Sequence, residues 1–167
     1  MITKNSKIVV LMGGPSTEAE ISKKTGKAVA DALLSLGYNV TPCEYIPDHV
    51  VEDLKRLSAE VVFIALHGKY GEDGTIQSVL ELAKIPYTGS GVPSSAITMD
   101  KIVSSRIFKQ AGLPMSKSQA SYLSEGIDAV EKGILNEFSF PVVLKPACEG
   151  STIGIEIVRE KEKLHEA

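Results

Sequence analysis

Residues 65–77, with the sequence ALHGKYGEDGTIQ, combine residue types that suit the binding of a small polar ligand. The segment contains three glycines, His67, and Glu72 followed by a second carboxylate. Imidazole and carboxylate groups can orient ammonium, hydroxyl and carboxylate groups of a ligand, and glycine lets the backbone approach it closely. An apolar run precedes the segment and helical apolar spacing follows it. The pattern predicts a strand-to-helix loop at the carboxyl edge of a parallel sheet, where open α/β folds bind ligands.

Each of these side chains also has a purely structural interpretation. His67 alone is compatible with a partly buried histidine whose hydrogen bonds are satisfied by the fold. Either Glu72 or Asp73 can cap the helix that starts near Gly74. The position of His67 in a loop directly after a buried strand gives a functional role the same weight as the structural one. Glu72 stays a candidate site residue if Asp73 supplies the cap.

A second polar loop, residues 13–18 with the sequence GGPSTE, follows the apolar run 7–12. Its spacing matches neither G-x-G-x-x-G nor G-x-x-x-x-G-K-[ST], so it predicts neither a dinucleotide site nor a P-loop. Thr17 and Glu20 have capping-box spacing, which predicts a helix start here. Glu18 would then lie near a helix N-terminus at the sheet's carboxyl edge. It either binds a ligand amine or interacts only with the helix dipole.

A third group of residues, further along the chain, has features suited to phosphate. Lys145 ends an apolar run, where a lysine is costly unless it meets an anion or a carboxylate. Residues 147–154, ACEGSTIG, can offer N–H groups and hydroxyls to phosphate oxygens, although an ordinary hairpin tip has similar composition. Lys101, in a first helical turn, opposes the helix dipole. A bound polyphosphate would explain it, and a surface lysine is the alternative.

Strands and helices alternate up to about residue 99 and would position the first two loops. The pattern predicts strands at 7–12, 39–45, 61–65 and 86–88, and helices at 51–57 and 75–83. A longer helix before Gly37 is expected to place one apolar face inward, made of Ile21, Ala28, Val29, Ala32, Leu33 and Leu36. This alternation is typical of an α/β fold with a Rossmann-like parallel sheet.

The pattern changes near residue 99 and predicts a second unit. Asp100 should cap a helix that runs to Ala111. We then expect a strand at 119–123, a helix with Ile127, Val130, Ile134 and Phe138 on one face, and an antiparallel hairpin of 141–146 and 154–158. Residues 1–99 and 100–167 are therefore expected to be separate domains, with the second one α+β and incomplete.

Composition excludes several other classes of protein. The 167 residues are 43% hydrophobic and carry a net charge of −3, and the 18 basic residues are scattered, so no basic face for nucleic acid is expected. No apolar run approaches the roughly 20 residues of a membrane span, and no signal-peptide pattern is present. Cys43 and Cys148 have neither disulfide-framework nor zinc-site spacing. We expect a soluble, cytoplasmic protein with no nucleic-acid or membrane partner.

The motifs, taken in order, resemble the N-terminal half of the D-alanine–D-alanine ligase family, which belongs to the ATP-grasp superfamily. The matching segments are GGPSTEAEIS at 13–22, ALHG at 65–68, GEDG at 71–74, YTGSG at 87–91, MDK at 99–101, AGLP at 111–114, KP at 145–146 and EGS at 149–151. The resemblance implies a Rossmann-like N-terminal (pre-ATP-grasp) domain over 1–99 and the start of an ATP-grasp domain over 100–167.

The resemblance also implies an activity. The family joins two D-alanines with ATP and Mg²⁺, or Mn²⁺, for peptidoglycan precursor synthesis. ATP phosphorylates the carboxylate of the first D-alanine, and the amine of the second attacks the acyl phosphate. Phosphoryl transfer of this kind depends on positioning and charge neutralisation.

By resemblance, residues of both units acquire roles. Glu18 would hold the ammonium of the first D-alanine, His67 would lie close to its carboxylate, and Glu72 would belong to the same substrate site. Ser151 would order the site through a hydrogen-bond network with Glu18, which makes this pair the catalytic candidates. The residues implied to contact ATP are Lys101, Lys145, Glu149, Gly150 and Ser151.

The family continues for about as long again, and the resemblance implies that its metal ligands and adenine pocket lie in that further part. The chain is therefore expected to be the N-terminal portion of a ligase, inactive alone and homodimeric as the full-length protein. The alternative is a non-enzymatic small-ligand binding module, or half of a split ligase. Lys145 and the 150–151 loop favour the ligase, because an amino-acid binder has no need of phosphate-directed groups. D-lactate or D-serine as the second substrate is left open.

Overall fold

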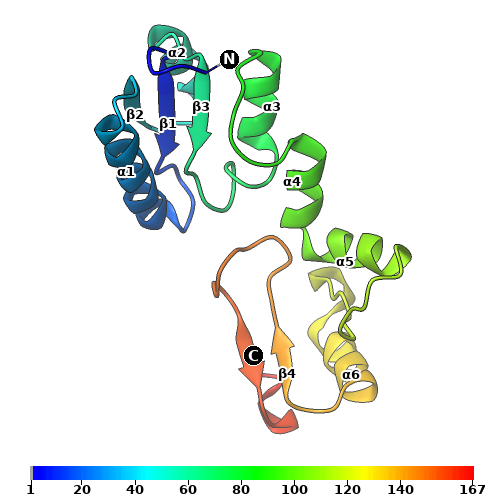
Figure 1. The fold of residues 1–167 in the computed structure, drawn as a ribbon. Coiled ribbons are helices and arrows are strands. Elements are labelled where there is room, and N and C mark those ends of the chain that lie inside the picture. The colour runs from blue at the N-terminus through cyan, green and yellow to red at the C-terminus, as the bar shows by residue number, and fades with distance from the viewer. Residues whose placement is uncertain (1) are drawn as a thin grey trace. The chain divides into compact units, whose positions relative to one another are not determined.

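The computed structural model describes residues 2–167, which form two compact units divided between Met99 and Asp100. The first unit is a parallel α/β layer structure, and the second is a small α+β unit (Figure 1).

The first unit contains the predicted parallel sheet. Its elements are β1 (Ile8–Met12), α1 (Ala19–Ser35), β2 (Val40–Glu44), α2 (Val50–Arg56), β3 (Val61–Ile64), α3 (Thr75–Leu82) and α4 (Val92–Met99). The strand order is β2-β1-β3, and both pairings are parallel, with Leu11 opposite Cys43 on one side and Ile64 on the other. The strand expected at 86–88 is reduced to a single parallel bridge between Val62 and Tyr87. Helix α4 was not predicted.

Helices cover both faces of this sheet. Alternate residues of β1 point to opposite faces, so Val9 and Leu11 belong to one apolar cluster while Ile8 and Val10 belong to the other. The first cluster includes residues of α2 and α3, and the second includes Ala30 of α1. The central strand is therefore buried on both sides, as its continuous apolar run predicts.

The inward face of α1 agrees with the predicted one only in part, because Val29 and Leu33 pack against the second apolar cluster and other predicted residues do not. Its buried residues are Ser22, Gly26 and Ala30, whereas Ile21 and Leu36 are 51% and 59% exposed. Small residues face the sheet because the helix lies very close to it: a Cβ on Gly26 would be 2.5 Å from the Cβ of Met12. The predicted capping box is also wrong, because Glu18 is the N-cap residue and makes no side-chain capping bond.

The second unit contains the predicted hairpin and two of the predicted helices. Its elements are α5 (Lys101–Gln110), the 3₁₀ turn η1 (Leu123–Glu125), α6 (Ile127–Glu137), β4 (Val142–Leu144), β5 (Glu156–Val158) and the 3₁₀ turn η2 (Lys161–Lys163). Asp100 caps α5 by accepting hydrogen bonds from the N–H groups of Ile102 (2.8 Å) and Val103 (3.0 Å).

β4 and β5 pair antiparallel, and their core cluster contains Ile134, Val142, Val158 and Leu164. The strand expected at 119–123 is absent from the described residues, which form there only an irregular segment and the start of η1. None of the described strands pairs with that segment, so it forms no β-ladder despite its strand-like composition.

Candidate functional site

The loops that follow β1 and β3 start side by side at the carboxyl edge of the first unit's sheet. The two strands are neighbours, and the N–H of Ala65 donates to the carbonyl of Leu11 over 2.9 Å. The loop after β1 leads to Glu18, and the loop after β3 begins with Leu66 and His67. This is the edge of a parallel sheet at which ligands bind in open α/β folds.

Glu18 lies against the loop that follows β3. Gly68 is buried and has φ of +68°, and a Cβ added to it would lie 3.3 Å from Glu18 Oε2. The backbone of Glu18 is held locally, because its N–H donates to the hydroxyl of Ser16 over 3.2 Å. The Glu18 carboxylate is thus close to the residue directly after His67, as the convergence of the two loops predicted.

His67 is half-buried and contacts α1. Its Nε2 lies 3.2 Å from the hydroxyl oxygen of Thr25. Since one ring nitrogen is engaged in this hydrogen bond, Nδ1 is the nitrogen that can serve a ligand. The sequence pointed to His67 but not to Thr25.

The two acidic residues at 72 and 73 hold the loop in different ways. Glu72 is exposed, and its Oε2 accepts a hydrogen bond from the N–H of Gly68 over 2.7 Å. Asp73 accepts hydrogen bonds from the N–H groups of Tyr70 and Thr75, each over 3.0 Å, so it holds the turn that precedes α3. Burial alone would raise the pKa of the Asp73 carboxyl, but these N–H groups outweigh burial and the pKa lies below its usual value. Neither Glu72 nor Asp73 is the N-cap of α3, which is Gly74 and makes no side-chain capping bond, so the predicted cap is wrong; Glu72 instead closes the turn after His67.

Ser22 was not predicted as a site residue, yet it joins the two loops. Its hydroxyl accepts a hydrogen bond from the N–H of Gly13 and donates one to the carbonyl of Ala65, both over 2.8 Å. The side chain is completely buried. The sequence feature that could have indicated Ser22 is its position four residues after Glu18, on the face of α1 that carries small residues.

In the second unit, Lys101 organises the loop between β4 and β5. Its backbone N–H donates to the carbonyl of Ala147 over 3.0 Å, and its ammonium donates to the carbonyl of Glu149 and, over 3.5 Å, to that of Ala147. The loop contains Ser151, whose φ of +51° places it in the left-handed region. The positive charge in the first turn of α5 is therefore used to bind backbone carbonyl groups.

Lys145 is not in the environment that the sequence argument assumed. It is exposed and follows the end of β4 at Leu144, so no burial cost requires an anion beside it. Within the described part of the chain no hydrogen bond or ion pair of its ammonium is formed. The prediction that Lys145 needs a neighbouring anion to offset burial is therefore wrong. The expectation that Lys145 contacts ATP rests on its place beside the 147–154 loop.

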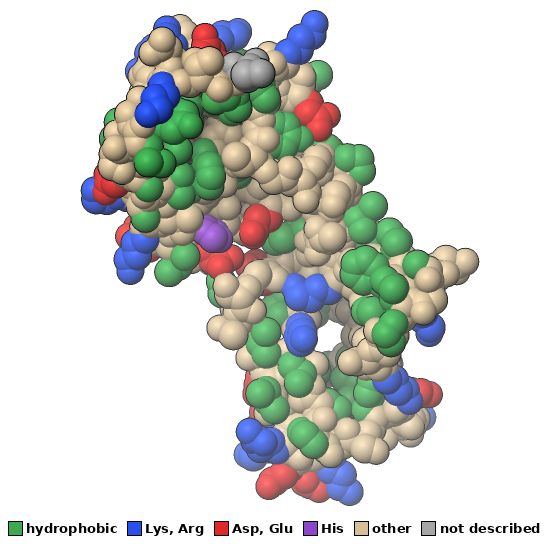
Figure 2. Space-filling model, viewed as in Figure 1, with side chains coloured by type: hydrophobic (Ala, Val, Ile, Leu, Met, Phe, Trp, Pro, Cys, Tyr) green, Lys and Arg blue, Asp and Glu red, His purple; other side chains and the backbone are tan. Residues whose placement is uncertain are grey.

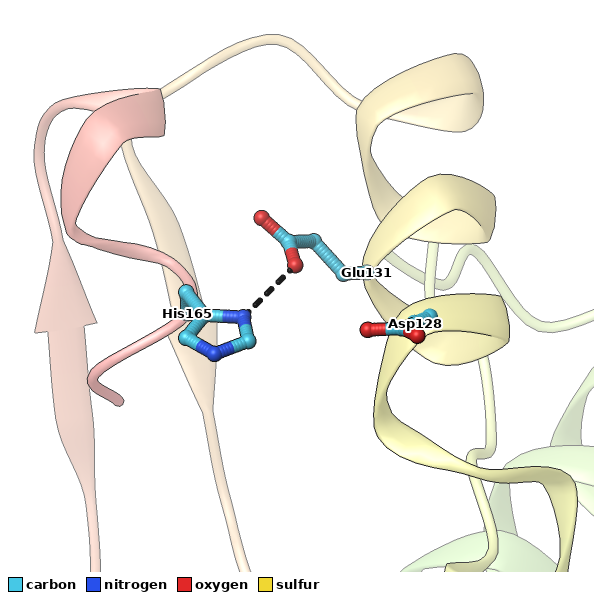
Figure 3. Close-up of side chains that lie close together, drawn as sticks. All are labelled: Asp128, Glu131 and His165. Carbon is cyan, nitrogen blue, oxygen red and sulfur yellow. Dashed lines mark hydrogen bonds and ion pairs between the residues drawn. The ribbon is translucent and has the colours of Figure 1, made fainter.

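A cluster that the sequence did not indicate lies elsewhere in the second unit (Figure 3). Asp128 and Glu131 of α6 and His165 each offer a ligand-type atom, and these atoms lie within 4.8 Å of one another. His165 Nδ1 is 3.0 Å from Glu131 Oε2. The hydrogen bond to Glu131, followed by attraction to its charge, raises the pKa of His165. This ion pair is sufficient to explain the arrangement.

Two surface properties concern possible partners. None of the helices in residues 2–167 is both long enough and apolar enough to cross a membrane. On the face shown in Figure 2, Lys and Arg side chains are spread over the surface, and acidic side chains lie among them in several places.

Fold and site together define an α/β protein in which Glu18 approaches the loop of His67 at the carboxyl edge of a parallel sheet, followed by an α+β unit whose 147–154 loop is bound by Lys101. The family described as D-ala D-ala ligase N-terminus matches residues 47–90, and that described as D-ala D-ala ligase C-terminus matches residues 107–167. The chain is 50% identical over 164 residues to the D-alanine–D-alanine ligase of Moorella thermoacetica, covering 96% of this chain and 53% of the relative. The chain is 46% identical over 164 residues to the D-alanine–D-alanine ligase of Geobacter sulfurreducens, covering 98% of this chain and 50% of the relative.

Solved structures show the same likeness. The D-alanine–D-alanine ligase of Bacillus anthracis matches with a TM-score of 0.77 and 34% identity, over 96% of this chain and 52% of that one. The same enzyme complexed with ATP matches with a TM-score of 0.74 and 33% identity, over 96% and 53%. The VanG D-Ala:D-Ser ligase of Enterococcus faecalis matches with a TM-score of 0.75 and 28% identity, over 97% and 58%. The chain belongs to the D-alanine–D-alanine ligase family, and it spans about half the length of the relatives it matches.

Proposed function

We propose that the chain is part of an ATP-dependent ligase that joins two D-alanines through an acyl phosphate, for peptidoglycan precursor synthesis. The observation that carries the proposal is the approach of the Glu18 carboxylate to the loop of His67 at the sheet's carboxyl edge. An amino acid carries an ammonium and a carboxylate a few ångströms apart. A carboxylate and an imidazole N–H on neighbouring loops complement these two groups.

On the substrate side, Glu18 would accept hydrogen bonds from the ammonium of the first D-alanine, and His67 would donate to its carboxylate. Glu72 would act through the loop, because its hydrogen bond to the Gly68 N–H fixes the backbone between the two binding groups. Ser151 would join Glu18 in ordering the reacting groups. This role of Ser151 rests on the family resemblance.

On the nucleotide side, the 147–154 loop and its lysines suit a polyphosphate. An ammonium has three donors, and Lys101 directs its own to the loop carbonyls of Ala147 and Glu149. It thereby adds positive charge to the loop that contains Glu149, Gly150 and Ser151. Lys145, exposed beside the same loop, can reach a phosphate without any desolvation cost of its own. ATP would supply the phosphoryl group, and these residues would bind and orient it.

The remaining assignments follow from the family. We assign residues 1–99 to the N-terminal ligase domain and residues 100–167 to the beginning of the ATP-grasp domain. Mg²⁺, or Mn²⁺, would accompany ATP, and we assign no metal ligand to this chain. We further propose a cytoplasmic, homodimeric full-length enzyme without nucleic-acid or membrane partners.

The test is whether this chain binds D-alanine at the two loops. Amide chemical shifts of residues 1–167 are recorded by NMR during titration with D-alanine up to millimolar concentrations. We expect changes confined to residues 13–18 and 65–74, and a weakening of about tenfold or more in Glu18→Gln, because a hydrogen bond to a charged group contributes about 1.5–3 kcal/mol. Asp31→Gln, on the exposed side of α1, is the matched control. Absence of any change in these loops would refute the proposal.

A further inference from the structure

We propose that Thr25 and Ser22 are positioning residues of the D-alanine site, and that Thr25 holds His67 in the tautomer with its proton on Nδ1. The inference rests on the proposed function, because it concerns how the substrate-binding groups are aimed. Neither residue needs to touch the substrate. Both act from α1 on the loop that follows β3.

Two residues of α1 and the residue at its N-cap face three positions of that loop. Glu18, Ser22 and Thr25 are spaced i, i+4 and i+7, which puts them on one helical face. Ser22 donates to the carbonyl of Ala65, Thr25 contacts the ring of His67, and the Glu18 carboxylate lies near Gly68, where an added Cβ would be 3.3 Å from its Oε2. The same rigid helix therefore fixes the Glu18 carboxylate and the His67 ring relative to each other.

Ser22 fixes the starting point of both loops. Its hydroxyl satisfies the N–H of Gly13 just after β1 and the carbonyl of Ala65 just after β3. All three groups are buried, so removal of the hydroxyl leaves two backbone groups without a partner. The adjacent face of the helix tolerates only small side chains, because Gly26 lies against Met12. Through the bonds of Ser22 and the close packing at Gly26, α1 fixes the distance between the starts of the two loops.

Thr25 determines which nitrogen of His67 is available as a donor. A hydroxyl can donate or accept, so the 3.2 Å contact with Nε2 permits either direction. A carboxylate needs an N–H, and Nε2 is already engaged by Thr25. The ring can serve a carboxylate in its neutral form only if Thr25 donates to Nε2 and the proton lies on Nδ1. The threonine thus converts the histidine into a fixed donor.

The experiment observes the tautomer directly. The chain is labelled with ¹⁵N-histidine, and long-range ¹H–¹⁵N correlations are recorded across a pH titration so that the neutral ring is observed. His49 and His165 serve as internal references. We expect neutral His67 to be protonated at Nδ1, to become a mixture of tautomers in Thr25→Val, and to keep the Nδ1–H form in Thr25→Ser. D-alanine affinity should fall roughly 3- to 10-fold in Thr25→Val, the equivalent of one hydrogen bond.

Controls separate positioning from general destabilisation. Thr98→Val removes an exposed helical hydroxyl in the same unit and should leave the His67 signals unchanged. Ser22→Ala should shift the amides of residues 13–18 and 65–68 together, whereas Ser35→Ala, in the last turn of α1, should shift neither.

An Nε2–H tautomer in the unmodified chain, or unchanged His67 signals in folded Thr25→Val, would overturn the inference, and the first of these needs no variant. If the tautomer behaves as expected while D-alanine does not bind, the positioning by Thr25 is supported and the proposed function fails. If D-alanine binds in a Glu18-dependent way while the tautomer is Nε2–H, the proposed function stands and this inference fails.

Discussion

The carboxylate of Glu18 lies in tight contact distance of the position that a side chain at Gly68 would occupy: a Cβ on Gly68 would be 3.3 Å from Glu18 Oε2. Gly68 also has φ of +68°, a conformation that L-residues adopt at a cost of about 1–2 kcal/mol, whereas achiral glycine adopts it freely. Glycine at this position therefore serves the backbone of the turn and the space for the carboxylate at once.

Gly68→Ala should affect both properties. We expect a loss of about 1–2 kcal/mol in the free energy of unfolding, from the backbone conformation, and displacement of the Glu18 carboxylate from the loop. Gly112→Ala is the matched control, because φ there is +74° and no atom lies within 4 Å of the added Cβ. Urea unfolding should show similar losses for both variants. The NMR titration with D-alanine should show weaker binding only for Gly68→Ala, and equal binding in the two variants would contradict the site.

Two helical glycines should respond in opposite ways to alanine. Alanine in a helix interior is normally favoured over glycine by about 1 kcal/mol. In Gly26→Ala the new Cβ would overlap the Cβ of Met12 at 2.5 Å, and overpacking costs about 1–3 kcal/mol, so we expect net destabilisation. In Gly133→Ala the nearest atom, at 3.0 Å, is the end of the exposed Gln119 side chain, which can move. We expect up to about 1 kcal/mol of stabilisation there. Urea unfolding measured for each unit by NMR checks both signs.

The sequence predicts the parallel sheet well because its strands are buried on both faces. A continuous apolar run such as 8–12 has no polar side to expose, so in an α/β fold it forms a strand that is covered on both faces. The sequence predicts the inward face of α1 only in part: Val29 and Leu33 pack against the core, but hydrophobicity also assigns the exposed Ile21 and Leu36 to it. Close approach of helix and sheet instead selects Ser22, Gly26 and Ala30. That selection depends on an interlayer distance, which the order of residues along the chain does not contain.

The site is predictable where a residue's type is unusual for its element, and not where its role depends on a partner. Glu18 and His67 stand out because they follow buried strands. Ser22 and Thr25 do not, because serine and threonine are ordinary in helices and their partners lie about 40 positions away, with separations of 43 and 42. Lys145 shows the opposite error: its apolar neighbours suggested burial, but the strand ends one residue earlier.

The ion pair of His165 and Glu131 predicts a pH dependence (Figure 3). The hydrogen bond and charge of Glu131 raise the pKa of His165 above 6.5, and Asp128 and Glu166 add smaller attractions. Because the folded-state pKa is raised, the stabilisation is fully present below about pH 6.5 and disappears as the pH rises through the raised pKa. Glu131→Gln should lower the pKa of His165 in an NMR titration and remove this dependence. Glu137→Gln, on the same helix but paired with Lys117, should leave the pKa of His165 unchanged. A His165 pKa that is the same with and without the Glu131 carboxylate would exclude the pair as its cause.

Lys101 offers a test of how the 147–154 loop is held. Lys101→Ala removes the ammonium that donates to the carbonyls of Ala147 and Glu149, and leaves only the backbone bond to Ala147. A hydrogen bond from a charged donor contributes about 1.5–3 kcal/mol, so the loop should open at least roughly tenfold more often. Hydrogen exchange of the amides at 148–153 should accelerate by that factor. Exchange in β4 and α6 should change little, because their core cluster does not include Lys101.

Lys109→Ala is the matched control for this experiment, since Lys109 lies in the last turn of the same helix and is exposed. In the full-length ligase, Lys101→Ala is further expected to raise the KM for ATP more than the KM for D-alanine, because the loop it holds is assigned to the nucleotide. Lys145→Ala should impair ATP use without accelerating exchange in the loop, because Lys145 forms no bond to it in the described chain. If Lys145→Ala accelerated exchange in the loop and Lys101→Ala did not, Lys145 and not Lys101 would hold the loop, which would contradict the proposed roles.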